Sequence, residues 1–574
     1  MAECSAMSVT QMLVLISSIW ILMAISIFQK PTHVWMIGNY LQLKRGGNIS
    51  WTGYSTLPTQ TTTKPLPPSS ASASVPRLRI THPNVEESEG FLPTSCTCKT
   101  APLRRSHIYE EQLSLPLPWF NVTSRQFLAK RHPNFPYSLV TNTSENWCHL
   151  MPPPHEIDWQ NVYYQSVTVF NTSYYLYSAF LDNRRRTNGR PCIRILAFTT
   201  AKEPNTPWCY IWSNTTGPPA ISQVIKIDYV DYQRKASDRV MFYILTCRTP
   251  EMHAPPLAVS IVRQPCDRAR TLLQITGAME RNTSTAFAKG DNRETKSRTP
   301  LWNVAVCGPA LFYYHEDISI RLVEWLELLR ALGFARVFLL QTIVHPNIEK
   351  VLQYYEAEGF VGITHFSYPP PYVTDPNIRR IWVLEQRKNM FAMENMYFTD
   401  CLLRHMHEYR FISHFDPDEM PMLPKHDSFP LWLYERIRKR PHLPGHEKQW
   451  YTSYDLSWYY HHDDLEPSKD KSLPKYLWFL RHSKRVIKDV NPILSKPTYD
   501  MDIVTGVYSH GALTCVYGKC RHKNYKCPRS VAYLGHYRRN CTGSCVSEED
   551  HSLLKYKDRV SSAVRKVLTE LKLI

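Results

Sequence analysis

Three carboxylates follow one short apolar segment in the second half of the chain. The segment FISHFDPDEMPML, Phe411 to Leu423, places Asp416, Asp418 and Glu419 after a run that is typical of a buried strand. Neighbouring acids repel one another unless a cation or a basic partner offsets their charge. Carboxylates suit hard divalent cations such as Mn²⁺ or Mg²⁺, which bridge to nucleotide phosphates. By itself the D-x-D spacing is more typical of a solvated acidic turn, so the surrounding elements decide between the two interpretations.

An alternation of strands and helices leads up to these acids. Strands are expected at 301–311, 335–342, 361–368 and 409–416, with helices at 316–334, 347–360 and 389–406. In the first helix, apolar residues recur at helical spacing: Ile318, Leu322, Trp325, Leu326, Leu329 and Leu332. Strands that alternate with helices predict a parallel sheet with helices on its faces, an α/β fold. Such sheets bind ligands at the carboxyl ends of their strands, where the acids fall, and Pro417 fixes the backbone between the two Asp residues.

The residues before this region have a different character. From about Trp159 to Gln264, short β-type runs are separated by Asn, Gly and Pro, which predicts a β-rich accessory domain. Residues 55–76 are rich in Pro, Ser and Thr and indicate an extended stalk, and residues 288–300 indicate a linker. Because the anchor and stalk have no core, residues before about Trp159 are expected to be dispensable for chemistry.

An apolar segment near the start predicts a membrane anchor. Met12 to Phe28, extended by Val9 and Thr10, approaches the ~20 residues that cross a bilayer. A cleaved signal peptide is the alternative, but no basic residue precedes the segment. Lys30, Lys44 and Arg45 follow it and weakly favour the opposite orientation.

Glycosylation sequons and cysteines favour a lumenal body. Fourteen of the 15 cysteines follow the apolar segment, an even number that suits an oxidising compartment. Seven N-x-Ser/Thr sequons also follow it, at Asn48, Asn121, Asn142, Asn171, Asn214, Asn282 and Asn540. We therefore expect a short cytosolic tail and a large lumenal body.

The formal charge of +18 does not indicate nucleic-acid binding. Lys and Arg are scattered, without the glycines and interleaved aromatics of an RNA-binding platform. A solvated basic surface that attracts acidic glycans, anionic lipid or a nucleotide diphosphate is the better interpretation.

Several motifs in order resemble glycosyltransferase family 92. They are VAVCGPAL, EDISIRLVEWLELLRALGFARVFLL, VLQYYEAEGF, TDCLLR, FISHFDPDE and YLGHYRR, and together they span about Leu301 to Arg539. YYLYSAFLDNR and CIRILAF also look like the β-rich region that precedes the catalytic domain in such proteins. The resemblance implies a GT-A type, Rossmann-like domain and an inverting, metal-dependent transfer of galactose from UDP-galactose. The implied acceptor is a glycoprotein glycan, for example a core fucose, and the implied location is the Golgi membrane with single-pass type II topology.

The resemblance also implies roles for individual residues. Asp416 and Asp418 match the family's D-x-D, with Asp418 the better metal candidate and Asp416 closer to a role at ribose or metal-bound water. Glu419 matches the acid after it. Late histidines of the family correspond to His510, a further metal candidate, and to His536. Asp400 matches an Asp-Cys pair, and a structural role is the alternative there.

Two departures from the family pattern concern metal geometry and activity. Pro417 stands where an aliphatic residue is usual, and Met420 where an aromatic residue is usual. An inverting transfer also needs a general base. The stretch YDLSWYYHHDDLEP offers four carboxylates beside aromatic residues suited to stacking on a sugar: Asp455, Asp463, Asp464 and Glu466, with Trp458, Tyr459 and Tyr460. A surface loop is the equally weighted alternative, and the sequence does not select the base.

Five cysteines gather near the C-terminus, at Cys515, Cys520, Cys527, Cys541 and Cys545. Their spacings fit the usual zinc pairs poorly, so disulfides are favoured over a zinc site. Two other functions stay open: a membrane-anchored glycan-binding protein that has lost turnover, and, more weakly, a metal-dependent phosphohydrolase.

The expected organisation has six segments. It comprises a cytosolic tail (1–8), a transmembrane signal-anchor (9–28), a stem (29–100), a β-rich accessory region (101–298), a catalytic domain (299–550) and a helical C-terminal tail (551–574).

Overall fold

The computed structural model describes most of the chain after residue 127. The described residues are 128–139, 151–184, 191–213, 217–250, 254–277, 303–438, 451–487, 494–516, 518–520, 524–538, 541 and 545–574. They all belong to one compact unit, residues 91–574. The expected anchor, stalk and linker lie outside the described residues. Within the described ranges, no helix combines the length and apolar character that a bilayer crossing requires.

The first half of the described chain forms an eight-stranded sheet in the order β1-β2-β3-β6-β5-β4-β7-β8, with β8 also paired to β2. Its strands are β1 (Gln165–Val169), β2 (Thr172–Asp182), β3 (Cys192–Thr199), β4 (Trp208–Trp212), β5 (Ala220–Tyr229), β6 (Met241–Arg248), β7 (Ala258–Val262) and β8 (Leu273–Thr276). The short β-type runs of the sequence are therefore strands, as expected. We call this sheet the β domain.

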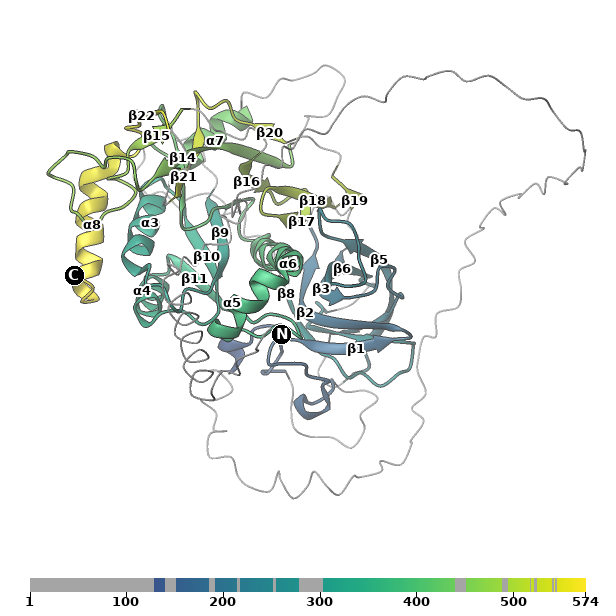
Figure 1. Ribbon diagram of the computed structural model, residues 1–574. Coiled ribbons are helices and arrows are strands. Elements are labelled where there is room, and N and C mark those ends of the chain that lie inside the picture. Colours follow the sequence, from purple (N-terminus) through teal and green to yellow (C-terminus); the bar gives the residue numbers. More distant parts are fainter. Residues whose placement is uncertain are drawn as a thin grey trace, which may run out of the picture. The chain divides into compact units, whose positions relative to one another are not determined.

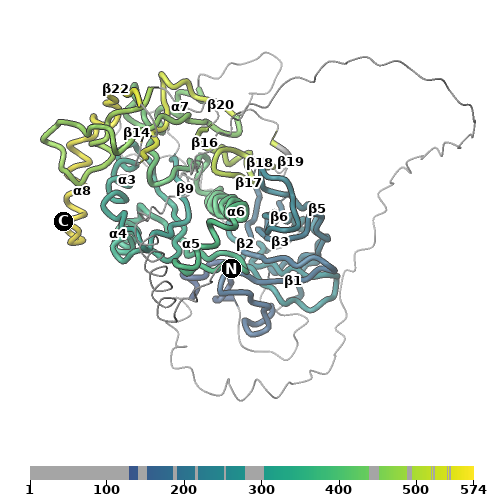
Figure 2. Tube along the Cα trace, in the orientation of Figure 1, coloured from purple at the N-terminus to yellow at the C-terminus, as the bar shows by residue number. Residues whose placement is uncertain are grey.

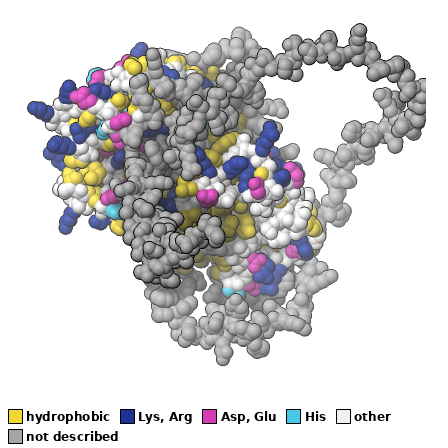
Figure 3. All heavy atoms as spheres, in the orientation of Figure 1, with side chains coloured by type: hydrophobic (Ala, Val, Ile, Leu, Met, Phe, Trp, Pro, Cys, Tyr) yellow, Lys and Arg dark blue, Asp and Glu magenta, His cyan; other side chains and the backbone are white. Residues whose placement is uncertain are grey.

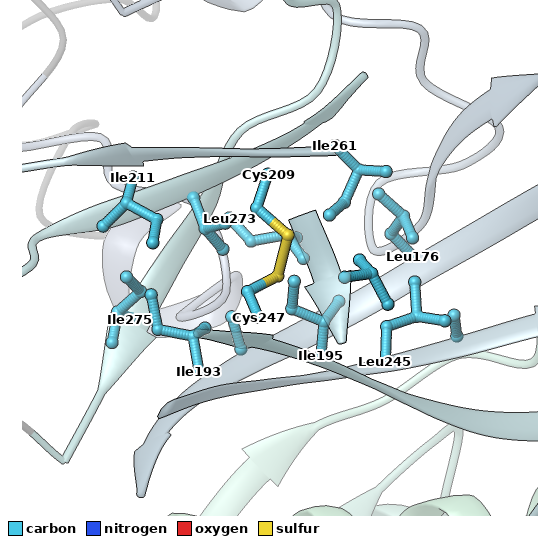
Figure 4. Packing of buried hydrophobic residues seen from close by; sticks show 14 of the residues in the cluster. Leu176, Ile193, Ile195, Cys209, Ile211, Leu245, Cys247, Ile261, Leu273 and Ile275 are labelled. Carbon is cyan, nitrogen blue, oxygen red and sulfur yellow. A yellow bond between two sulfur atoms is a disulfide. The ribbon is translucent and has the colours of Figure 1, made fainter. Parts of the chain in front are cut away.

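Apolar side chains fill the inside of the β domain, as Figure 4 shows around the disulfide between Cys209 and Cys247. The disulfide joins β4 to β6, which are not neighbours in the sheet. Ile195 and Leu245, on paired strands, lie in the same cluster and are fully buried. Burying one such side chain contributes about 1.5–3 kcal/mol, so this cluster is a main source of the domain's stability.

The second half contains an 11-stranded mixed sheet. Its continuous path is β11 (Val361–His365), β10 (Arg336–Gln341), β9 (Val304–Leu311), β12 (Phe411–His414), β16 (Ser495–Asp500), β14 (Ser453–His462), β15 (Lys484–Val486) and β22 (Ser547–Glu549). The first four strands are parallel, and β16 is antiparallel to β12. Off this path lie β13 (Glu419–Met422), β20 (Tyr525–Lys526) and β21 (Tyr533–Arg538), and β17 (Val504–Tyr508), β18 (Gly511–Cys515) and β19 (Gly518–Lys519) form a separate small sheet.

The helices are α3 (Ser319–Ala331), α4 (Pro346–Ala357), α5 (Pro376–Glu385), α6 (Arg387–His405), α7 (Phe429–Arg438) and α8 (Lys557–Glu570). Every apolar position at helical spacing between Ile318 and Leu332 is buried, so the predicted helix and its inward face are confirmed. Gly333 ends α3 with a positive φ of 91°, a conformation that side chains with a Cβ rarely adopt. The C-terminal α8 packs against α3, as the trace in Figure 2 shows.

The helix α5 was not expected from the sequence. Its inner face buries Arg379, Trp382 and Val383, but Ile381 and Leu384 are more than 60 % exposed. The apolar side chains therefore do not follow one buried stripe.

The helix α6 connects the two halves of the structure. It contacts β9 and β17 as well as β2 and β6 of the β domain (Figure 1). Asp400 on α6 accepts a hydrogen bond of 2.7 Å from the Ser178 hydroxyl on β2 and pairs with Arg404 at 2.9 Å. Arg184, beside β2, is ion-paired with Asp182 and donates to the carbonyl groups of Met501 and Val504. Buried polar contacts thus hold the β domain to the second half of the chain.

Residues shortly before Trp159 contribute to a core, which the expectation of their dispensability did not take into account. Phe135, Met151 and Ile157 are buried in one cluster with Trp212. They are apolar and pack beneath β4, so the folded part of the molecule begins before Trp159.

Basic side chains do not gather into one patch on the face drawn in Figure 3. Lys and Arg there are dispersed among acidic and uncharged groups over the described surface. This distribution agrees with a solvated basic surface.

Candidate active site

The three acids form a tight turn at the carboxyl end of β12. The Asp416 amide donates to Glu419 Oε2 at 3.0 Å, and the Glu419 amide donates to the Asp416 carbonyl at 2.9 Å. The Trp325 indole on α3 donates to the Glu419 carbonyl at 3.0 Å. Because β12 runs parallel to β9, the turn lies at the edge of the sheet where the sequence places it.

Lys496 is the basic partner of this turn. It lies on β16, with only 2 % of its side chain exposed, and its Nζ is 2.7 Å from Asp416 Oδ2 and 3.2 Å from Glu419 Oε2. Burial would raise the pKa of Asp416, but the Lys496 charge outweighs it and lowers that pKa to about 2. Burial raises the pKa of Glu419 well above its ordinary value. The repulsion between neighbouring acids is therefore offset at Asp416 by a lysine.

His414 completes the surroundings of Lys496. Its Nδ1 hydrogen donates to the Cys307 carbonyl at 2.8 Å, and its Nε2 accepts from Lys496 Nζ at 3.1 Å. Burial and the neighbouring Lys496 charge hold the pKa of His414 well below its usual range. His414 is therefore neutral and acts as an acceptor for the ammonium.

Asp418 has a different environment. Its Oδ2 lies 3.3 Å from His536 Nε2, and both side chains are almost completely buried. Neither Asp418 Oδ2 nor the two ring nitrogens of His536 make a hydrogen bond. In the sheet, Glu419 of β13 pairs with His536 of β21. This pairing places the Asp418 side chain next to the His536 ring. Burial lowers the pKa of His536, so this neighbour is a neutral imidazole.

An aromatic face extends from this pair along β14. Trp458, Tyr460 and His462 alternate with residues that point the other way. The Trp458 and His536 rings lie 4.4 Å apart, and the Tyr460 and His536 rings 5.6 Å apart. Tyr459 packs against Tyr533 instead, so the three aromatics predicted to face a sugar do not share one face.

His510 lies at the turn between β17 and β18. Its Nδ1 hydrogen donates to the Ser495 carbonyl at 2.9 Å, next to Lys496, and its ring lies 5.3 Å from that of Trp458. Burial and the Lys496 charge lower its pKa to about 4, so the ring is neutral. No described His, Cys, Asp and Glu side chains assemble into a group of three that could hold a metal ion. Asp416, Asp418 and His510 are thus neighbours of one turn and not a preassembled ligand set.

The four carboxylates considered as a base lie in separate environments. Asp455 accepts from Ser453 at 2.5 Å and from Asn524 at 3.1 Å. Asp464 accepts from the Cys541 amide, and Glu466 pairs with lysines at the surface. Asp463 accepts from the Trp478 indole at 2.5 Å, and burial raises its pKa. The charges of Asp463 and of Asp418 both act on one largely buried guanidinium group.

That group belongs to Arg321 on α3, the first of two charged residues besides Lys496 that sequence reasoning missed. Burial lowers the pKa of Arg321, whereas Asp463 and Asp418 oppose the shift. The second is Glu394 on α6, where burial, followed by the Asp416 charge, raises the pKa to about 7. Arg321 and Glu394 both lie inside segments predicted as helices. A charged residue among the apolar residues of such a segment was the sequence signal that could have identified each as a largely buried charge.

The other sequence candidates have structural roles. Asp400 joins α6 to the β domain through Ser178 and pairs with Arg404. Disulfides connect Cys515 to Cys520 and Cys541 to Cys545, which confirms the preference for disulfides over zinc there, and Cys527 is buried and unpaired. Cys401 is bonded to Cys307, which ties α6 to β9.

Comparison with protein families accounts for the second half of the chain. Residues 303–572 match the family model of glycosyltransferase family 92. This part of the chain belongs to glycosyltransferase family 92. The family 92 region includes the turn, Lys496, His536 and α8, and it implies glycosyltransferase activity with a sugar donor and a glycan acceptor. No curated protein shows a significant match to the chain.

Proposed function

We propose that this protein is an inverting galactosyltransferase that uses a divalent metal and transfers galactose from UDP-galactose to a hydroxyl group of a glycoprotein glycan. The observation that carries the proposal is Asp418. It is a buried carboxylate with an oxygen that makes no hydrogen bond, at the carboxyl end of a parallel strand in a family 92 region. The parallel order β11-β10-β9-β12 supports a GT-A type domain around it.

The residues of the turn fit a divalent cation through Asp418. A carboxylate oxygen without a hydrogen-bond partner is the ligand that Mn²⁺ or Mg²⁺ prefers, and such ions often use one or two carboxylates and complete their coordination with phosphates and water. When bound, the ion would supply positive charge to the diphosphate leaving group. Asp416 fits the implied role at ribose or metal-bound water, and His510 could add a neutral nitrogen.

The transfer itself needs a base, and we assign this role to Asp463. In the reaction the carboxylate takes the proton of the acceptor hydroxyl, and the oxygen forms a bond to C1 of the sugar. The bond from C1 to the phosphate oxygen breaks, and UDP leaves with the electron pair. The charges of Asp463 and Asp418 both act on Arg321, and burial raises the pKa of Asp463, which favours proton uptake by its carboxylate.

The aromatic face of β14 supports a site for the acceptor sugar. Tyr460 is half-buried, next to His536, and the Arg538 guanidinium lies 4.6 Å from its ring centroid. Aromatic rings with polar groups at their edge suit the mixed apolar and hydroxylated surface of a sugar.

The test is UDP release from UDP-galactose by purified protein, with and without Mn²⁺ and a fucosylated N-glycan acceptor. UDP-glucose and UDP-N-acetylglucosamine serve as matched donors. We expect release that requires both acceptor and metal and that is fastest with UDP-galactose. Glycan binding without release from any donor would instead support the non-catalytic alternative, for which the pairing of Asp416 with Lys496 is the favourable observation.

A further inference from the structure

Lys496 is a buried charge that the proposed transfer does not use. Its ammonium group contacts three acceptors, Asp416 Oδ2 at 2.7 Å, Glu419 Oε2 at 3.2 Å and His414 Nε2 at 3.1 Å. The contacts with Asp416 and His414 are hydrogen bonds, and the contact with Glu419 is an ion pair. The Lys496 charge also acts on the buried Glu394 of α6 and on His510, so Lys496 lies at the centre of the charged groups around the turn.

The position of Lys496 is fixed by the sheet. β16 pairs with β12 through residues 498–500 and with β14 through residues 495–499, and the pairing of Lys496 with Leu456 holds the backbone of residue 496. The side chain is 2 % exposed, so water does not replace the contacts. The Lys496 ammonium group therefore stays in contact with the carboxylates of the turn.

The two aspartates differ in what they can offer to a cation. The Asp416 carboxylate is hydrogen-bonded to an ammonium, and a divalent ion that used the same carboxylate would be placed beside that positive charge. Asp418 Oδ2 faces the His536 ring at 3.3 Å from Nε2 and makes no hydrogen bond. The two aspartates of the D-x-D motif therefore differ in their charged surroundings, because only Asp416 is paired with Lys496.

We propose that Lys496 is a positioning residue that supplies the positive charge at Asp416 and Glu419 and keeps the Asp416 carboxylate out of the coordination of a divalent ion, which binds through Asp418. The inference rests on the proposed function, in which the protein uses a divalent metal ion. It concerns the different roles of Asp416 and Asp418 within the turn. Asp416 is then bound by Lys496 of the protein itself, and Asp418 is the residue that binds the metal ion.

The experiment measures Mn²⁺ binding alone, by isothermal titration of the purified lumenal protein without donor or acceptor. We expect Asp418→Asn to weaken Mn²⁺ binding at least tenfold and Asp416→Asn to change it less than twofold. Lys496→Met frees two carboxylates, so we expect Mn²⁺ binding at least tenfold tighter than in the wild type. Lys496→Arg keeps the charge and is the matched control, with binding close to that of the wild type.

Two results overturn the inference. One is a loss of Mn²⁺ affinity in Asp416→Asn as large as in Asp418→Asn. The other is equal binding by the wild type and Lys496→Met, including no binding by either. Where Lys496→Met does not fold, Lys496→Met/Glu419→Gln restores the charge balance and takes its place. Donor turnover is a separate readout, so an inactive protein with the expected Mn²⁺ pattern refutes only the proposed function.

Discussion

Asp416 and Asp418 are two positions apart in the sequence, yet one faces an ammonium group and the other a neutral imidazole. The D-x-D spacing predicted that a cation or a basic partner offsets their repulsion, and it located the turn correctly. It did not distinguish the two residues, because the distinction comes from β16 and β21, which follow the turn by more than 70 residues. A lysine in LSKPTYD carries no local signal that it is buried against carboxylates.

Asp418→Asn tests the residue at the centre of the proposed site. The change keeps the size of the side chain but removes the charge that would bind the metal. Each ~1.4 kcal/mol of lost transition-state stabilisation slows turnover tenfold, so we expect turnover at least ~10²-fold slower. The measurement is donor turnover across a Mn²⁺ titration, with thermal melting as the folding control. Equal rates for both proteins at every Mn²⁺ concentration would contradict it.

Asp455 gives a prediction about pH. Burial raises its pKa in the folded protein to about 6, from an ordinary value of 3.8. Between about pH 4 and pH 6 the folded state keeps a proton that the unfolded state has lost, so the free energy of unfolding falls as pH rises. Asp455→Asn has no such proton, and we expect a smaller fall between pH 4 and pH 7. Urea unfolding of both proteins at the two pH values measures the difference, and an equal fall in both would refute it.

At the scale of elements, short β-type runs identified β9, β10 and β11, of which β9 and β10 are buried almost throughout, and helical periodicity identified α3 and α4. It missed α5, whose apolar residues are partly exposed and whose helix is set by its first residues. Asp375 accepts hydrogen bonds from the Asn377 and Ile378 amides, and Pro376 occupies the first turn. The sequence Asp-Pro before a helical segment was the signal that could have identified it.

Asp400→Asn tests the assignment of α6 as the connection to the β domain. Asp400 is almost fully buried, and its loss of charge leaves Arg404 with a weaker partner. Removing one member of a buried ion pair costs about 3–5 kcal/mol, so we expect a reduced unfolding free energy of that order. Turnover per folded molecule should stay within about twofold of the wild type, because the hydrogen bonds and the ion pair of Asp400 go to Ser178 and Arg404. Denaturant unfolding measures the first quantity and donor turnover the second, and a large loss of turnover in a stable variant would indicate a catalytic role.

Arg410→Lys, at another partly buried pair with Asp500, is the matched control for a milder change at an ion pair.

At the scale of the whole molecule, the β domain and the family 92 region share buried contacts, and residues before Trp159 contribute to the core. We expect a secreted protein that begins at residue 101 to fold, and one that begins at Trp159 to be strongly destabilised. The shorter protein lacks Phe135, Met151 and Ile157, and removing buried apolar side chains of this size costs about 2–5 kcal/mol each. Thermal melting and solubility of the two proteins decide the matter, and equal melting temperatures would contradict the prediction.

The topology of the chain is a separate prediction. Asn171 is exposed at the tip of the turn between β1 and β2, where an oligosaccharide has room. If the body is lumenal, protease added to intact microsomes should leave the protein whole, and glycosidase should increase its mobility on a gel. Digestion without detergent would show the opposite topology.

The contacts of Arg184 affect the order of events during synthesis. Its two carbonyl partners lie 317 and 320 residues further along the chain. At about 5–20 residues per second, the ribosome delivers them roughly 15 to 65 seconds after Arg184. During that interval Asp182 is the partner already present, and the β domain awaits its final contacts. A chain that terminates before residue 500 never supplies these two carbonyl groups. In such a chain the buried Arg184 lacks two of its hydrogen-bond acceptors, and we expect the β domain to be less stable.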